Sequence, residues 1–575
     1  MNLPVSWRFL NSRSVSLWVA GSALSFAMPI GAHAAEIEAG TLQQQIDRNQ
    51  TFKLPRQSLP LLPKPLEKKP DTGLKIPVKS FKLQGNTLLD EAQIQAFLSL
   101  YQNKEMSFVE IENVVSEVAD LYRNAGWTVK AYLPEQDVKD GEILIQIVEA
   151  RLGQVVIDGE VPSPATAASL KAIIQRRQAV GDYLNGSAVD RALLIANDIS
   201  GVYITGSLTE GSADSETDIV LKAASKPSKE GNATFDNTGS RGTGISRLAL
   251  NTNLNSVVQN GDQLSGNVIH TAASEYARLG WKVPVGTDGW TVGASVSEMT
   301  YRALQFQETV APTGSSGTRG IEGIYPLIRS RAKNLYVSFA IEDKQFLNNS
   351  EGQVKSKYSS RLRTVSFYGN SFDELAGGGA NTASLTFVNG FLNLDNSPNA
   401  SEIATTTQTA GEFNKIRYAL NRQQVITPEL SFIGSLSGQV SQGGKNLDSS
   451  EKFFLGGSSG LRAYPSSEAG GGKGVMANLE LRWQVSSDIS LSGFYDIGRV
   501  VMFPSKNLQD VTALNEYSLR GRGISVAWQG DEGVTVKLIV ARRIGNNPNA
   551  NIETGKDLDG SLIRNRAWIA LNIPF

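Results

Sequence analysis

Side chains that carry most enzyme chemistry are scarce in this chain of 575 residues. It has no cysteine and two histidines, His33 and His270. Thiol nucleophiles, disulfides and metal sites built from cysteines or several histidines are therefore excluded. A hydrolase needs a histidine beside its serine or aspartate, and the residues around His270 form no recognisable catalytic group. We expect no enzyme activity, no catalytic or metal site and no cofactor.

A carboxylate in the last third of the chain indicates structural chemistry instead. Apolar and polar residues alternate along 489–495, as expected for a strand with two different faces. If that strand continues, Asp496 points inward, within the pattern Phe494-x-Asp496-x-Gly498.

An arginine that could pair with this carboxylate precedes it in a long loop, in the pattern Leu461-Arg462-Ala463-Tyr464. Glycines flank the pattern and allow sharp folding. A guanidinium offers a fixed fork of hydrogen bonds that fits a carboxylate. Arg462 would reach Asp496 only if the loop enters the interior. The alternative is a solvated loop arginine and an unrelated inward aspartate.

The N-terminus has the pattern of an export signal. Positive charges at Arg8 and Arg13 precede an apolar stretch and the small-residue pattern Ala32-His33-Ala34. We expect cleavage between Ala34 and Ala35, which makes residues 1–34 the signal peptide. The alternative is a membrane anchor, which the proline and the small residues at the end of the stretch disfavour.

Two repeats follow a short N-terminal helix and a linker. We expect the helix within 35–53 and a proline-rich linker over 54–77, which favours an extended spacer. Residues 78–151 and 152–228 then share the order strand, helix, helix, strand, strand. Helix starts are predicted at Ser107-x-x-Glu110, a capping box, and at Ser187-x-x-Asp190.

From about residue 229 to 575 the pattern has period two, with segments of about ten residues. Such repeats are typical of an outer-membrane barrel, and the length predicts about 16 strands around an aqueous channel. A soluble sandwich, which also alternates, is the alternative. The predicted connections are short at 486–488 and 530–533 and long at 441–476, 496–522 and 543–566. In such barrels the short turns face the periplasm and the long loops face outside. The chain end, Phe575, is therefore expected on the periplasmic side. Trp568 falls on the polar face of the last strand without an evident reason.

The order of these motifs resembles the outer-membrane transporters of two-partner secretion, the TpsB family, which exports haemolysins and filamentous haemagglutinins. The resemblance covers nearly the whole mature chain. Besides the loop and wall patterns, it rests on residues 126–141, which resemble the end of a first POTRA (polypeptide-transport-associated) domain, and on Asp236-Asn237-x-Gly239 at the barrel start.

The resemblance implies two periplasmic POTRA domains, a 16-stranded barrel in the bacterial outer membrane and an N-terminal helix that can plug the pore. It implies an inward-folded loop whose Arg462 forms a salt bridge with Asp496. One departure is that the family's loop pattern usually has glycine where this chain has Ala463. Implied partners are a secreted exoprotein such as an adhesin or haemolysin, outer-membrane lipid, and the barrel-assembly machinery and periplasmic chaperones, with Phe575 as the assembly signal.

Three other functions fit parts of the pattern. A barrel-assembly insertase of the same superfamily is the main alternative, although it would usually carry more POTRA units and no plug helix. An outer-membrane enzyme would have to use His270. A passive porin would leave the two N-terminal repeats unexplained. The near balance of 55 basic and 56 acidic residues gives no indication of nucleic-acid binding.

Overall fold

The computed structural model describes residues 37–48, 54, 73, 75–138, 140–159, 161, 164–213, 215–304, 310–505 and 514–575. The expected signal peptide, its cleavage site at Ala34 and Ala35, and most of the linker lie outside these residues. None of the helices within this part of the chain has the length and apolar character needed to span a membrane.

The first α/β unit is a small sheet covered by two helices. Strand β5 lies between β2, which is parallel to it, and β4, which is antiparallel. Ser107 and Glu110 form the predicted capping box at the start of the long helix α3. Helix α2 ends at Leu98, and a short strand, β3, follows it and pairs with β1. The elements are β1 (Lys75–Val78), β2 (Ser80–Gln84), α2 (Glu91–Leu98), β3 (Lys104–Ser107), α3 (Phe108–Asn124), β4 (Val129–Tyr132) and β5 (Glu142–Glu149).

The second unit repeats the arrangement, with β8 between a parallel β6 and an antiparallel β7. The predicted cap at Ser187-x-x-Asp190 is wrong. Helix α5 begins at Gly186, and the Asn185 side chain accepts a hydrogen bond from the Ala188 amide at 2.9 Å. Asparagine is as good a helix N-cap as serine. Asn185 therefore caps the helix, which begins one residue before Ser187. The elements are β6 (Arg151–Asp158), α4 (Pro164–Arg177), α5 (Gly186–Asn197), β7 (Val202–Glu210) and β8 (Glu216–Ser225).

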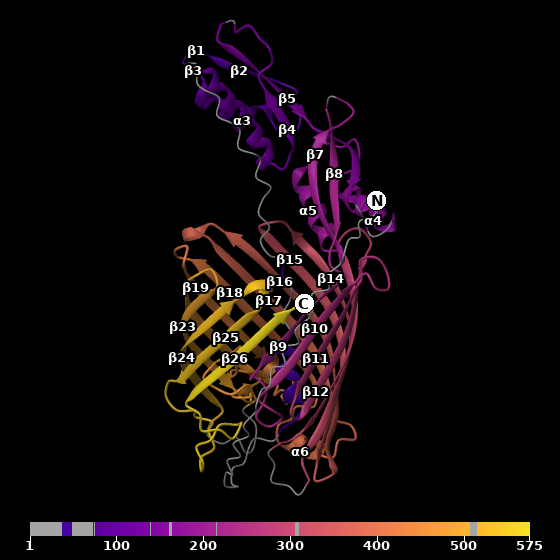
Figure 1. The fold of residues 1–575 in the computed structure, drawn as a ribbon, viewed down its shortest axis with the longest axis vertical. Coiled ribbons are helices and arrows are strands. Elements are labelled where there is room, and N and C mark those ends of the chain that lie inside the picture. Colours follow the sequence, from indigo (N-terminus) through magenta and orange to yellow (C-terminus); the bar gives the residue numbers. More distant parts are fainter. Residues whose placement is uncertain are drawn as a thin grey trace, which may run out of the picture. The chain divides into compact units, whose positions relative to one another are not determined.

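Sixteen antiparallel strands form a closed barrel, as predicted (Figure 1). The strands are β9 (Lys229–Asp236), β10 (Arg247–Asn255), β11 (Gln263–Thr271), β12 (Ser274–Val285), β13 (Trp290–Arg302), β14 (Thr313–Arg329), β15 (Lys333–Ser350), β16 (Gln353–Asp373), β17 (Gly379–Asn393), β18 (Gly411–Val425), β19 (Leu430–Ser441), β22 (Lys473–Gln484), β23 (Ile489–Val501), β24 (Glu516–Gln529), β25 (Thr535–Arg543) and β26 (Asn565–Pro574).

The last strand closes the barrel on the first. Phe575 and Gly231 exchange backbone hydrogen bonds of 3.0 Å in both directions. Near the other end of this seam, the Asn237 amide group donates to the Ala567 carbonyl and accepts from the Ile569 amide. The pattern Asp236-Asn237-x-Gly239 therefore lies at the seam where the barrel closes. Every barrel strand then has a hydrogen-bonded neighbour on both sides, which its backbone requires because lipid offers no hydrogen-bond partners.

Strand lengths differ in places from the expected connections. β23 continues to Val501 and β24 begins at Glu516, so the connection expected over 496–522 is shorter than predicted. The connections on the side of Phe575 are short, as predicted. The opposite side has the long ones, but it also has two tight turns, at 272–273 and 351–352. The length of a single connection therefore does not by itself show which side of the membrane it faces.

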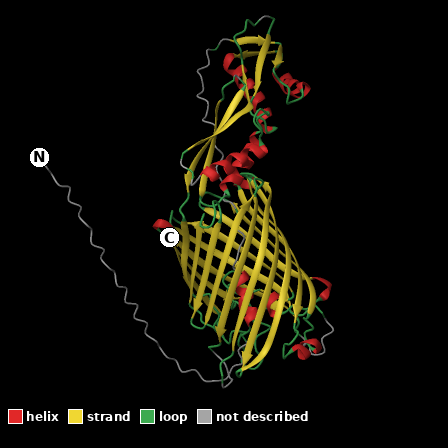
Figure 2. Cartoon of the chain, turned by 90° about the vertical axis from the view of Figure 1, so that its right-hand side faces the viewer, coloured by secondary structure: helices red, strands yellow, loops and turns green. Residues whose placement is uncertain are grey.

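The barrel interior holds a helix and a folded loop. Helix α1 (Ala39–Arg48) lies within the ring of strands in both views (Figures 1 and 2). Its first amide donates to Asn348 Oδ1 on β15 at 2.8 Å, and Gln43 accepts from Ser316 on β14 at 2.8 Å. On its apolar side, Ala39 and Leu42 pack in one cluster with inward side chains of several strands.

Candidate functional site

The long connection between β19 and β22 folds into the barrel. We call residues 442–472 the inner loop. It contains a one-turn helix, η4 (Ser449–Glu451), and a pair of two-residue strands, β20 (Phe453–Phe454) and β21 (Gly470–Gly471). All four residues of the pattern 461–464 are buried. A polar loop with this degree of burial needs partners on the inner wall.

The structure brings Arg462 and Asp496 together. Arg462 donates to Asp496 from three groups: Nε at 3.0 Å, NH2 at 2.7 Å and its own backbone amide at 3.0 Å. Asp496 is completely buried, and Arg462 is 6% exposed. β23 continues past residue 495, so its alternation does place this carboxylate on the inner wall. A buried charge pair of this kind is tolerated because its hydrogen-bonding groups are satisfied.

Sequence analysis missed two further polar partners on β22. Glu480 accepts from Arg462 NH1 at 2.9 Å and also from Arg482 at 3.0 Å. Asn478 donates to Asp496 at 2.8 Å and to the Gly460 carbonyl at 2.9 Å. Both lie on the polar face of an alternating strand, so parity could have identified them as inward residues. It could not show that they meet the loop.

Two aromatic side chains complete the surroundings of Arg462. The guanidinium carbon lies 3.4 Å from the centre of the Phe494 ring, a cation–π contact. The Trp568 indole donates to the Arg462 carbonyl at 2.7 Å. This contact explains why Trp568 lies on the polar, inward face of β26. The wall residue Phe494 and the last strand therefore both hold the loop tip.

Small residues allow the loop to approach the wall. A Cβ added at Gly498 would lie 2.9 Å from a Leu455 methyl and 3.1 Å from a Leu461 methyl. Ala463, which stands where the family usually has glycine, is fully buried and does not have a positive φ. Alanine is therefore unstrained at this position. Next to it, the Tyr464 hydroxyl donates to the Arg520 carbonyl at 3.1 Å.

A second buried ion pair holds the earlier part of the loop. Lys415 on β18 lies 2.6 Å from Glu451 Oε2, and both side chains are almost fully buried. The Lys415 ammonium also donates to the Glu451 carbonyl at 2.9 Å. The inner loop is thus fixed to the wall at two separate points.

Helix α1 contacts both the wall and the inner loop. Asp47 pairs with Lys344 on β15 at 2.6 Å. Burial alone would raise the pKa of Asp47, but the Lys344 ammonium and hydrogen bonds outweigh it and hold the pKa below its ordinary value of 3.8. Arg48 donates to the carbonyls of Phe454 and Gly456 at 2.9 Å each, and Gln44 donates to the Lys452 carbonyl at 3.0 Å.

The remaining sequence candidates lie elsewhere. His270 is on the outer face of β11, its side chain is 59% exposed, and its Nδ1 is 3.5 Å from Glu275. Phe575 ends the chain at the closing seam with an exposed side chain. Within the described residues, no group of three or more histidines, aspartates or glutamates could hold a metal ion. The contacts in the lumen hold the inner loop and α1 in position.

Comparison with known families decides what this architecture is. Residues 215–523 match the family of the haemolysin secretion/activation proteins ShlB/FhaC/HecB, and residues 76–150 match the ShlB-type POTRA domain. The chain belongs to this family. Its members are outer-membrane transporters of two-partner secretion with periplasmic POTRA domains, and so is this protein. The match favours secretion over the barrel-assembly alternative.

Individual relatives agree with this assignment. The heme/hemopexin transporter protein HuxB of Haemophilus influenzae is 22% identical over 488 residues, which are 83% of this chain and 85% of the relative. The outer membrane transporter CdiB of Dickeya dadantii is 24% identical over 428 residues, 72% of this chain and 74% of that protein. The solved structure of CdiB from Escherichia coli has a TM-score of 0.69 at 17% identity, and covers 95% of this chain and 100% of its own.

We predict that Asp496→Asn loosens the inner loop more than Glu480→Gln does. Asp496 accepts four hydrogen bonds and Glu480 accepts two from arginines, and breaking a buried ion pair costs about 3–5 kcal/mol. Limited proteolysis of the folded barrel measures the cleavage rate within 442–472. We expect a clear increase for Asp496→Asn and a smaller one for Glu480→Gln.

The matched control is Arg499→Gln on the same strand, because Arg499 is exposed on the outer face, where it pairs with Glu516 and does not contact the inner loop. It should leave the cleavage rate unchanged. Equal rates for Asp496→Asn and this control would mean that Asp496 does not hold the loop.

Proposed function

We propose that α1 and the inner loop do different work in the transporter: α1 is a plug that leaves the lumen when a client enters, and the inner loop stays anchored. The observation that carries this proposal is the difference in their attachment. The loop tip is held by a buried arginine with two carboxylate partners, whereas α1 has one ion pair, between its own Asp47 and Lys344 of β15, and a few polar contacts.

The composition of α1 supports its role as the removable part. Its ten residues are AGTLQQQIDR, with Leu42 and Ile46 as the only large apolar side chains. Burying each of these contributes about 1.5–3 kcal/mol at most, and a helix of this length is marginal by itself in water. The plug is therefore the interior element that is least costly to displace.

Client recognition is assigned to the two POTRA units. Their sheets leave β2 and β4 as edges in the first unit and β6 and β7 in the second. An unfolded exoprotein can add a strand to such an edge through backbone hydrogen bonds, which demands little of its side chains. The description of the family as haemolysin secretion/activation proteins supports a secreted protein client, and we assign to this role a large exoprotein such as an adhesin or a haemolysin.

Transport then proceeds through the polar lumen without a chemical reaction. The sequence has no nucleotide-binding loop, so folding of the client outside the cell supplies the direction. The exposed, outward His270 supports the view that the protein catalyses no reaction. During biogenesis the chain engages periplasmic chaperones and the barrel-assembly machinery, with Phe575 at the strand end as the signal.

Removing the protein should stop export of one client and leave other barrels intact. We expect a candidate client outside the cell only in strains that produce the protein, as measured by immunoblotting of medium and cells. Normal assembly of other outer-membrane barrels is the control. Unchanged client export together with failed barrel assembly would instead indicate an insertase.

Weakening the plug should open the pore. Asp47→Asn and Lys344→Gln each remove one partner of the pair in the lumen, so we expect higher conductance in planar lipid bilayers. The swap Asp47→Lys with Lys344→Asp should restore part of the closure. The control Gln345→Ala, on the outward side of the same strand, should behave as the wild type.

The same pair gives a pH dependence. While α1 is docked, the pKa of Asp47 lies below its ordinary value of 3.8. The ion pair therefore stabilises the docked helix fully at pH values above 3.8. This stabilisation is lost as the pH falls through the lowered pKa and Asp47 becomes protonated. Wild-type conductance should rise on acidification below about pH 4, and Asp47→Asn should show a smaller rise. Equal conductance of all variants at pH 7 would show that α1 does not block the pore.

A further inference from the structure

Three arginines lie close together on the lipid-facing side of strands β14–β16. On β15 the even residues Lys344 and Asn348 point inward to α1, so odd residues such as Asp343 point outward. The register pairs Arg319 of β14 with Asp343, and Asp343 with Arg361 of β16. Arg363, two residues along, shares their outward face.

These arginines lie toward the extracellular end of the wall. The chain enters β9 from the periplasmic POTRA units, and successive strands alternate in direction. β16 therefore starts on the extracellular side at Gln353 and runs toward the periplasm. Lys355 and Lys357 continue the outward row above Arg361. The outward side of β14–β16 thus carries four cations in its extracellular half, and Arg363 lies at the midpoint of β16.

The charge of the three arginines is only partly balanced. Asp343 is the single outward carboxylate in this part of the three strands, and it pairs with Arg361 at 2.8 Å, with both side chains more than half exposed. Among the described residues, the guanidinium groups of Arg319 and Arg363 form no hydrogen bond or ion pair, and both side chains are exposed. An arginine on a lipid-facing wall is unfavourable unless it reaches the polar interface.

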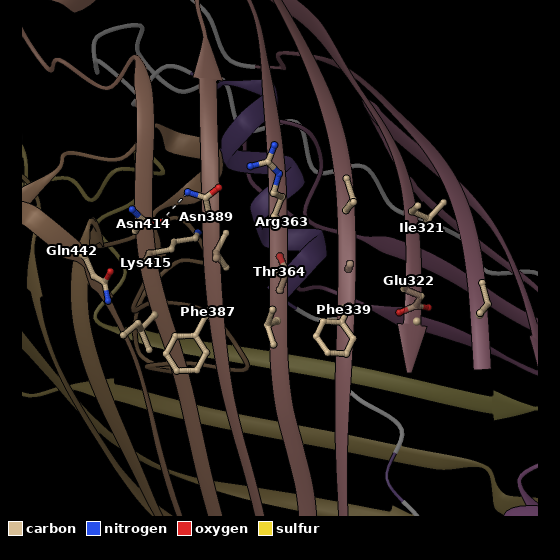
Figure 3. Close-up of a pocket in the computed structure, with 17 residues that line it drawn as sticks. Ile321, Glu322, Phe339, Arg363, Thr364, Phe387, Asn389, Asn414, Lys415 and Gln442 are labelled. Atoms are coloured by element: carbon tan, nitrogen blue, oxygen red, sulfur yellow. Dashed lines mark hydrogen bonds between the residues drawn. The ribbon is translucent and has the colours of Figure 1, made fainter. Parts of the chain in front are cut away.

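An apolar groove begins beside the arginines. A cavity of about 660 Å³ lies on the wall between β13 and β18, with Ile321, Phe339 and Phe387 among its lining residues and Arg363 at its margin. Figure 3 shows these side chains on the near side of the strands, with α1 behind the wall. They are 41–59% exposed, which places the groove on the outer surface.

A second outer groove, of about 590 Å³, continues the same arrangement on β11–β15. Leu279, Trp281 and Val296 line it, together with Arg319 and Asp343. Each groove therefore combines an apolar channel with an arginine at its edge. An acyl chain attached to a phosphorylated headgroup has the same two parts.

We propose that this wall binds a phosphorylated lipid of the outer leaflet of the outer membrane. Arg319, Arg361 and Arg363 hold its phosphate groups, and its acyl chains occupy the two grooves. Guanidinium groups bind phosphate through paired, charge-assisted hydrogen bonds. The inference rests on the outer-membrane location of the family and is independent of how α1 and the inner loop act.

Lipid retained by the purified full-length protein tests the proposal. The protein is extracted in a mild detergent, and native mass spectrometry counts bound phosphorylated lipid before and after a high-salt wash. We expect the wild type to retain at least one such lipid. The variant Arg319→Gln/Arg361→Gln/Arg363→Gln should retain one fewer, and Arg363→Gln alone should retain less than the wild type.

Arg417→Gln is the matched control. Arg417 lies on β18 with the inward parity of Lys415, so this variant loses the same charge inside the lumen. It should retain lipid as the wild type does. A change in gel migration on heating shows that each barrel is folded. If the triple variant does not fold, the comparison of Arg363→Gln with the wild type tests the proposal by itself. Equal lipid counts in the wild type and the folded arginine variants would overturn the proposal and indicate non-specific annular lipid.

Discussion

Closure of the strand ring is the constraint on which the rest of this molecule depends. Lipid offers no partners to backbone groups, so a spanning sheet must satisfy every edge within itself. Here Gly231 and Phe575 complete the ring through the backbone, and Asn237 bridges the same seam through its side chain. Once the ring is closed, each strand has an apolar face toward lipid and a polar face toward the lumen.

A polar lumen explains how the interior elements are held. In water, surface ion pairs contribute little, but the partners of the inner loop are buried and have several hydrogen bonds each. Arg462 alone contacts two carboxylates, the Phe494 ring and, through its carbonyl, Trp568. Such a network is costly to take apart one partner at a time. Helix α1 lies against this fixed loop, and the side chains of Gln44 and Arg48 join the two through hydrogen bonds to loop carbonyls.

Much of the fold follows from local sequence pattern. Alternation and length predict the 16 strands, and strand parity predicts that Asp496 faces inward. Capping residues predict the start of α3 but misplace the start of α5, because Asn185 precedes the serine that fits the same pattern. The strand β3 was not predicted, since its four residues KEMS have no clear alternation and it is stabilised by pairing with β1. Contacts such as Arg48 with Phe454 join residues far apart in the chain, and no local pattern encodes them.

The most direct test of separate roles for plug and loop is to tie them together. The chain has no native cysteine, and an ideal Cβ at Gly40 would lie 2.8 Å from the Ser449 side-chain oxygen and 2.7 Å from the Tyr358 hydroxyl, which must shift to admit it. Gly40→Cys with Ser449→Cys would therefore allow a disulfide between α1 and the inner loop. Client secretion is measured with this bond oxidised and then reduced, beside each single variant. Because α1 must leave the inner loop before a client can pass, we expect oxidation to block secretion and reduction to restore it. Undiminished secretion with the disulfide intact would contradict the account, because α1 would then not need to leave the loop.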